Sequence, residues 1–151
     1  MRIGVISDTH GLLRPEALAA LQGCERIIHA GDIGKPQVLD ALREIAPLEA
    51  IRGNVDSAQW AQGLPERLDL RLGGVAIHVL HDLKALDFAP ATRGVSVVIA
   101  GHSHKPQIEQ RGGVLYLNPG SAGPRRFRLP ISLAVLHIED GQARAALLTL
   151  G

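Results

Sequence analysis

The sequence predicts a single α/β domain, residues 1–151, in which two mixed β-sheets stack and helices cover their outer faces. In the first half, short apolar runs alternate with amphipathic segments of helical spacing, which implies parallel strands joined by crossover helices. In the second half, two-residue turns at Gly73-Gly74, Gly112-Gly113 and Asp140-Gly141 separate strand-like runs, which indicates hairpins. Hydrophobic residues make up 46% and aromatic residues only 3%, so we expect an aliphatic core.

The elements of the first half follow from their apolar spacing. A helix begins near Pro15, because proline suits the first helical turn. A second helix, residues 36–46, presents an apolar face formed by Val38, Leu39, Leu42 and Ile45. The strands between them are expected at about residues 2–7, 26–30 and 48–52.

The second half contains more strands and fewer helices. One short helix is expected within residues 83–92. The apolar run of residues 96–100 has the composition of a fully buried strand. The other strands, which flank the hairpin turns, are expected at residues 67–72, 75–80, 108–111, 114–118, 131–138 and 143–150.

Charge and composition exclude several classes of protein. Sixteen basic and fifteen acidic residues give a formal charge of +1, which does not favour binding nucleic acid by bulk charge. No run approaches the roughly 18 apolar residues of a membrane span, and the N-terminus does not resemble a signal peptide. Cys24 is the only cysteine, so no disulfide forms within the chain. We therefore predict a cytoplasmic protein, and the hairpin edges are compatible with a homo-oligomer.

Polar side chains of the kind that bind metals follow five of the predicted strands. Ligands of open α/β sheets bind outside the carboxyl ends of the strands, so these side chains are expected to converge. Carboxylate, amide and imidazole groups without thiolate suit manganese, iron, zinc or cobalt. The side chains are Asp8, His10, Asp32, Asn54, His81, His102 and His104.

Seven ligands are too many for one four-coordinate ion and suit two ions that share a bridging carboxylate. Two divalent cations, two aspartates and one bridging hydroxide leave a residual charge of about +1, which favours an anionic substrate such as a phosphate ester. Taken alone, Asp8 and His10 are better explained by a turn with a helix cap, and Asp32 and Asn54 are compatible with turn residues. His81 alone is a weak signal. The pair His102 and His104 is the hardest to explain by packing.

The order of these motifs resembles the calcineurin-like metallophosphoesterases, and especially their small YfcE-like phosphodiesterases. The motifs are Asp8-Thr9-His10-Gly11, Gly31-Asp32, Gly53-Asn54-Val55-Asp56, His81, Gly101-His102-Ser103-His104 and Asn118-Pro119-Gly120-Ser121. The resemblance implies a four-layer αββα sandwich. It also implies that one metal is held by Asp8, His10 and His104, and the other by Asn54, His81 and His102, with Asp32 as the bridge.

The resemblance further implies a dinuclear phosphodiesterase in which a metal-bridging hydroxide attacks the phosphorus of a small diester. Asp32, Asn54 and His102 are its expected catalytic residues, and manganese its expected ion, with iron, zinc, cobalt or nickel as alternatives. Many larger relatives place a histidine, which protonates the leaving group, where this chain has Val55. The alternative function is an interaction scaffold that binds metal with little or no turnover, like the retromer subunit of this fold.

Other residues near the motifs have open assignments. Arg125 is the best of three neighbouring arginines to grip a phosphate, and a solvated loop is the alternative. His29 either orients Asp32 or packs in the core, and Asp56 either supports a ligand or forms a turn. Asp82 is expected to cap a helix. The segment 118–121 is expected to be a structural turn beside the site.

Overall fold

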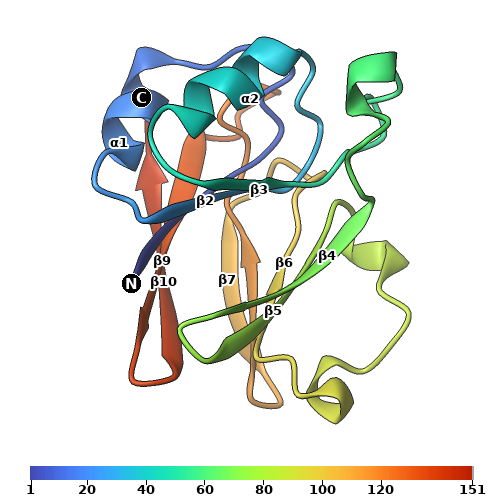
Figure 1. The fold of residues 1–151 in the computed structure, drawn as a ribbon, viewed down its shortest axis with the longest axis vertical. Helices are drawn as coiled ribbons and strands as arrows, with labels where there is room; N and C mark the ends of the chain where they lie inside the picture. The colour runs from blue at the N-terminus through green and yellow to red at the C-terminus, as the bar shows by residue number, and fades with distance from the viewer. Residues whose placement is uncertain (151) are drawn as a thin grey trace.

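Two five-stranded β-sheets stack face to face in the computed structural model, which describes residues 1–150 (Figure 1). The first sheet has the order β10 (Gln142–Thr149), β9 (Ser132–Glu139), β1 (Arg2–Ile6), β2 (Arg26–His29), β3 (Leu48–Ala50). The second has the order β4 (Arg67–Leu72), β5 (Val75–Leu80), β6 (Val97–Ile99), β8 (Val114–Asn118), β7 (Gln107–Arg111). The two mixed sheets of the predicted sandwich are confirmed.

Each sheet combines a parallel centre with antiparallel hairpins. Strands β1, β2 and β3 run parallel, and so do β5, β6 and β8. The hairpins β4–β5, β7–β8 and β9–β10 turn at the three predicted glycine-containing sites. The parallel strands therefore direct their carboxyl ends toward one end of the sandwich, where ligand sites form.

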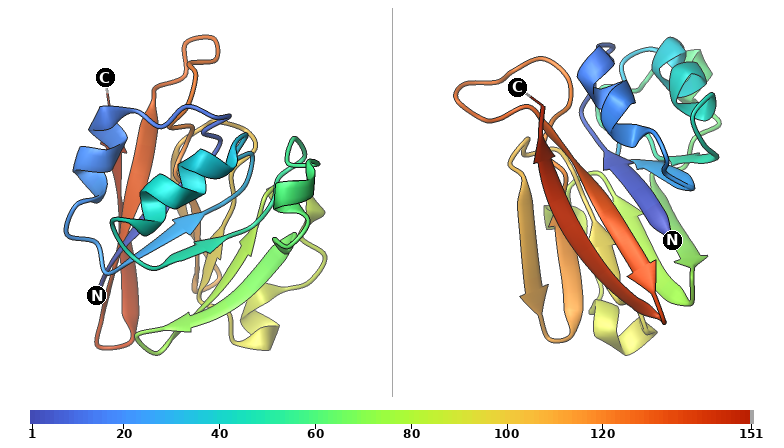
Figure 2. Two further views of the ribbon diagram at one scale, coloured as in Figure 1. Left: turned by 45° about the horizontal axis from the view of Figure 1, so that its top comes forward. Right: turned by 90° about the vertical axis from the view of Figure 1, so that its left-hand side faces the viewer.

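Two helices, α1 (Pro15–Leu21) and α2 (Pro36–Arg43), cover the outer face of the first sheet (Figure 2). Both begin at a proline, as the sequence predicts for α1. The predicted extent of the second helix, 36–46, is wrong at its C-terminal end. Pro47 disfavours helical geometry at Ala46, so the chain turns after Arg43 instead of continuing the helix.

The outer face of the second sheet has a much thinner cover. In place of the single helix expected within residues 83–92, two separate 3₁₀ turns form, η2 (Leu83–Ala85) and η3 (Pro90–Arg93). Pro90 disfavours helical geometry at Ala89, which separates the two turns. A third 3₁₀ turn, η1 (Gln59–Ala61), follows β3. The layer opposite the α-helices is therefore built from single turns and loops.

The space between the sheets is filled by aliphatic side chains, as the composition predicts. Ile3, Val5 and Ile28 of the first sheet pack with Val79 and Ile99 of the second, and all are at most 1% exposed. This core fixes how the two sets of parallel strands face each other. Among residues 1–150, no helix has the length and apolar character that a membrane span requires.

Candidate metal centre

The predicted ligands gather at the carboxyl ends of strands from both sheets. They follow β1, β2 and β3 in the first sheet and β5 and β6 in the second. Two groups form in which one ligand atom from each residue lies within 4.8 Å of the others: Asp8, His10 and His104, and Asp32, His81 and His102. The site therefore lies where the two sheets meet.

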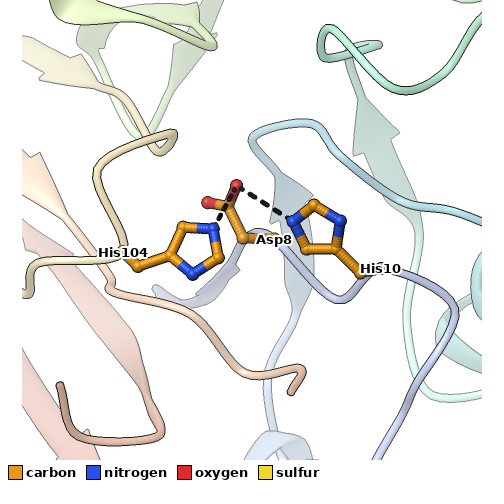
Figure 3. Close-up of side chains that lie close together, drawn as sticks. All are labelled: Asp8, His10 and His104. Atoms are coloured by element: carbon orange, nitrogen blue, oxygen red, sulfur yellow. Dashed lines mark ion pairs between the residues drawn. The ribbon is translucent and has the colours of Figure 1, made fainter. Parts of the chain in front are cut away.

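The first group converges on one carboxylate oxygen (Figure 3). Oδ1 of Asp8 lies 3.8 Å from Nε2 of His10 and 3.4 Å from Nε2 of His104. These separations are long for hydrogen bonds and suit atoms that bind a common cation, since metal–ligand bonds of about 2.0–2.2 Å leave neighbouring ligands about 3 Å apart. Asp8 and His104 are buried, and His10 is half-buried.

The second group is in contact with the first through Asp32, and also through Asp8, whose Oδ1 lies 3.8 Å from Nε2 of His81. Oδ2 of Asp32 lies 3.2 Å from Nε2 of His81 and 3.7 Å from Nε2 of His10, which belongs to the first group. His102 stacks edge-on with His81 at 5.2 Å between ring centroids. Asn54 lies in an exposed turn after β3 and lines a cavity with His81. Asp32 is thus placed between the two groups, as a bridging ligand requires.

Four buried polar atoms at this site have no hydrogen-bond partner. They are Oδ1 of Asp8, Nε2 of His10, Nε2 of His81 and Nδ1 of His104. A buried polar atom without a partner costs about 1–3 kcal/mol, so a cluster of four needs an explanation. The first three face one another, and divalent cations would satisfy them, whereas His104 faces Asp8 with its other ring nitrogen, Nε2. The residues therefore fit the metals that the sequence predicts.

Five of the predicted ligands adopt left-handed backbone conformations that residues other than glycine rarely adopt. Such geometry is unfavourable and persists only where the surroundings enforce it, typically at functional sites. The residues, with their φ angles, are Asp8 (55°), His10 (46°), Asp32 (58°), His102 (69°) and His104 (63°). At each of these residues the chain turns sharply after its strand. The short loops can therefore bring these side chains together.

Backbone and side-chain hydrogen bonds orient Asp8. Its N–H donates to the carbonyl of Gly31, at 3.0 Å, which joins the loops after β1 and β2. Its Oδ2 accepts from Oγ of Ser7, at 2.7 Å, and from the N–H of His102, at 3.1 Å. Only Oδ1 is left without a partner, and this is the atom on which His10 and His104 converge.

A second contact between the sheets orients His81. Its Nδ1 lies 2.7 Å from the carbonyl of Ala30, so Nδ1 carries the hydrogen and Nε2 faces Asp32. Burial lowers the pKa of His81, but the Asp32 carboxylate that faces Nε2 and the carbonyl of Ala30 outweigh it and raise the pKa above the usual value. Burial raises the pKa of Asp32, yet the adjacent His81 and the hydrogen bond from the Val55 N–H lower it to about 2. Asp32 is therefore an ionised carboxylate at neutral pH.

Asp56 supports the ligand loops and does more than form a turn. The buried carboxylate accepts from the N–H groups of Ile33, Gly34 and Gly53, at 3.0, 3.0 and 2.9 Å. It therefore ties the loop that carries Asp32 to the turn that carries Asn54. Charge-assisted bonds of this kind are stronger than neutral ones, which suits a contact between two short loops.

The segment 118–121 forms the expected turn beside the site. The side chain of Asn118 donates to the carbonyl of Gly101 and to Oγ of Ser103, both at 3.0 Å, and so fixes the loop that carries His102. Oγ of Ser121 donates to the carbonyl of Asp8, at 2.9 Å. The turn thus supports residues from both groups.

His29 holds two ligand loops together and does not contact Asp32 as a hydrogen-bond partner. Its Nδ1 accepts from the N–H of Gly31, at 3.1 Å, so Nε2 carries the hydrogen and donates to Oγ1 of Thr9, at 3.0 Å. Thr9 in turn donates to the carbonyl of Ile33, at 2.9 Å. Full burial lowers the pKa of His29 to about 4. Nearby carboxylates oppose this shift only in part.

This buried neutral imidazole predicts a loss of stability in acid. The unfolded chain protonates His29 below pH 6.5 and the folded protein only near pH 4, so between these values the unfolded state binds more protons and stability falls as the pH falls. The full effect is about 3 kcal/mol. Urea unfolding of metal-free protein at pH 7 and pH 4 measures it. The free energy of unfolding of His29→Gln should change less between the two pH values than that of the wild type. The control His137→Gln should behave as the wild type. An equal change in all three proteins would contradict the role of His29.

Three further residues lie close to the ligands. Val55, the position of the missing histidine, has a 49% exposed side chain, and its N–H donates to Oδ1 of Asp32 at 3.1 Å. Asp82 caps η2 through the N–H of Lys84, as expected, and lies 3.8 Å from Nε2 of His102. Of the three arginines, Arg126 lines a cavity beside His102, and Arg125 is exposed on the same loop. Phosphate binding by Arg125 stays a prediction.

Similarity to known proteins extends over nearly the whole chain. Residues 1–141 match the calcineurin-like phosphoesterase superfamily domain. A probable metallophosphoesterase of Methanothermobacter thermautotrophicus is 35% identical over all of this chain and 94% of its own. The phosphodiesterase YfcE of Escherichia coli is 29% identical over 90% of this chain and 87% of its own. The structure of Vps29 from Entamoeba histolytica in complex with Zn²⁺ superposes with a TM-score of 0.76, at 25% identity over the whole of both chains.

Proposed function

Because this chain belongs to the calcineurin-like phosphoesterase superfamily, we propose that it is a phosphodiesterase that uses two divalent metal ions to hydrolyse a small phosphodiester. The observation that carries the proposal is a set of three buried, unpartnered atoms that face one another across both groups: Oδ1 of Asp8, Nε2 of His10 and Nε2 of His81. The relatives described as phosphodiesterases support the choice of diester over monoester. A protein without metal chemistry would have no reason to keep these polar atoms buried and unpaired.

In this proposal Asp8, His10 and His104 hold one ion, Asn54, His81 and His102 hold the other, and Asp32 bridges them. Manganese is the proposed ion, and iron, zinc, cobalt or nickel would fit the same donors. When bound, the pair of ions supplies a hydroxide nucleophile at neutral pH and offsets the negative charge that develops during in-line attack on phosphorus.

The side chains of the protein prepare the site in three ways. Asp32 stays ionised because His81 and the Val55 N–H lower its pKa, so binding the metals requires no proton loss there. His81 presents Nε2 because Ala30 takes the hydrogen of Nδ1. His102 has a side chain 43% exposed, the most open of the histidines in the two groups, and is therefore placed to contact a phosphate oxygen of the substrate.

The alternative is a metal-binding interaction scaffold with little or no turnover, and the likeness to Vps29 favours it. Val55 is compatible with this alternative, because its side chain cannot transfer a proton to a leaving group. The full set of seven metal-type side chains argues for the enzyme, since a scaffold has no need of the exposed Asn54 or of the half-exposed His102 as ligands.

A hydrolysis assay separates the two functions. Protein stripped of metal should not hydrolyse bis(p-nitrophenyl) phosphate, and Mn²⁺ should restore activity in the wild type but not in Asp8→Asn. A parallel assay with p-nitrophenyl phosphate should give the lower rate, as expected of a diesterase. If the wild type binds Mn²⁺ and is still no faster than Asp8→Asn, the protein is a scaffold.

A further inference from the structure

Two cavities flank the metal centre, and they differ in character. A cavity of about 490 Å³ lies on the side of Asn54 and His81, and a larger one of about 840 Å³ lies on the side of His102. Asp82 lines both, so the cavities adjoin at the centre. A phosphodiester carries two ester arms on one phosphate, and two cavities that meet at the site offer a place for each arm.

The larger cavity exists because the cover over the second sheet is thin. Its floor includes Val98 of β6 and Tyr116 of β8, whose side chains face outward from the sheet, and its wall includes Leu86, just after η2. A full helix over this face would have filled the space. With only the two 3₁₀ turns above it, the apolar floor remains accessible from the side of His102, at a size typical of small-molecule sites.

Phe127 projects beside this cavity in an unusual conformation. It lies on the loop between β8 and β9, orange in Figure 2, which extends beyond the ends of the strands. Its side chain is 88% exposed, and its φ is +56°, a left-handed value that is strongly disfavoured for a bulky residue. Neither burial nor backbone geometry explains a phenylalanine here, and strained residues of this kind cluster at ligand-binding positions.

The remaining lining suits a flat group attached to an anion. The chain has only four aromatic residues, and two of them, Phe127 and Tyr116, line this one cavity. The guanidinium of Arg111 stacks over the Tyr116 ring at 4.3 Å. Lys84 and Arg126 add positive charge near His102, against the carboxylates of Asp82 and Glu109. Planar faces with a slight excess of positive charge favour a planar aromatic group on a phosphate.

We propose that the cavity beside His102 binds a planar aromatic ester arm of the substrate, a nucleobase or an aryl group, and that Phe127 stacks on it. The inference rests on the proposed diesterase function, and it adds that the natural diester carries a nucleoside or another aromatic group on one arm. Phe127 is then a specificity-determining residue, because it contacts the arm and not the phosphorus. The smaller cavity, whose lining includes Arg52, Gln62 and Arg67, takes the other arm.

Competitive inhibition of bis(p-nitrophenyl) phosphate hydrolysis tests this proposal. In the Mn²⁺-loaded wild type, the inhibition constant of adenosine 5′-monophosphate should be about fivefold or more below that of ribose 5-phosphate. Stacking of one base strengthens binding by at least this factor. In Phe127→Ala this preference should fall close to one. Leu147→Ala removes an exposed leucine from β10 and is the matched control, in which the preference should persist.

Binding of adenosine to the metal-free protein separates this inference from the proposed function. In ¹⁵N NMR, adenosine should shift the amide signals of Gly101, Arg126 and Phe127. Shifts confined to Arg52, Ser57 and Gln62, which line the other cavity, would overturn the assignment of the arm. Adenosine binding at Phe127 without any Mn²⁺-dependent hydrolysis would remove the enzyme function alone. If the wild type is a dimer that Phe127→Ala converts to a monomer, the cavity belongs to an interface between copies and the proposal is wrong.

Discussion

The variant Asp32→Asn is expected to lose at least about a thousandfold in Mn²⁺-dependent kcat for bis(p-nitrophenyl) phosphate. Asp32 contacts histidines of both groups, with Oδ2 at 3.2 Å from Nε2 of His81 and 3.7 Å from Nε2 of His10. Its charge offsets that of both ions, and asparagine has the same shape without the charge. Metal ions stabilise the transition state by several kcal/mol, and about 4 kcal/mol corresponds to a thousandfold change in rate.

The loss should come from the centre and not from unfolding. An asparagine oxygen still accepts the N–H of Val55, so the melting temperature of the metal-free variant should stay close to that of the wild type. Stabilisation by added Mn²⁺ should shrink, because a ligand that binds only the folded state raises its melting temperature. Asp69→Asn removes an exposed carboxylate that pairs with His78, and this control should keep its activity. An Asp32→Asn variant with wild-type turnover would exclude the bridging role.

The location of the site was predictable from the sequence because each ligand follows an apolar strand. A polar residue directly after a buried parallel strand lies at the edge where ligands bind, whichever helices connect the strands. This reasoning needs only strand periodicity, and it places Asp8, Asp32, His81 and His102 together. The role of each as a metal ligand still rests on the proposed function.

The supporting contacts were not predictable, because they depend on how short loops fold in three dimensions. No local pattern indicates that Asp56 accepts three N–H groups from two loops, or that His29 joins Thr9 to Gly31. The left-handed φ of the ligands also conflicts with local preference, and an aspartate or histidine gives no sign of it in the sequence. The open floor beneath Phe127 exists only because the segment before β6 forms two 3₁₀ turns in place of one helix.

The second large effect is expected at Val55, the position of the missing histidine. An exposed valine beside Asn54 contributes little to packing, so its replacement should be tolerated in the turn that Asp56 holds. Without a proton donor here, the departing oxygen must leave as an anion, which p-nitrophenolate does easily and an alkoxide does not. General acid catalysis raises the rate by about 10²–10⁴-fold, so the wild type should hydrolyse aryl diesters far faster than alkyl diesters.

The variant Val55→His should therefore raise turnover of an alkyl diester, such as a dinucleoside phosphate, by about tenfold or more, toward the lower end of the range for general acid catalysis. Turnover of bis(p-nitrophenyl) phosphate should change little, because that leaving group needs no proton. Val55→Asn is the matched control: it is polar, similar in size and unable to transfer a proton, and it should leave the alkyl-to-aryl ratio of kcat near the wild-type value.

An unchanged ratio in Val55→His, with the metal still bound, would mean that water or the substrate already supplies the proton. Val55 would then have no influence on which diesters this site hydrolyses.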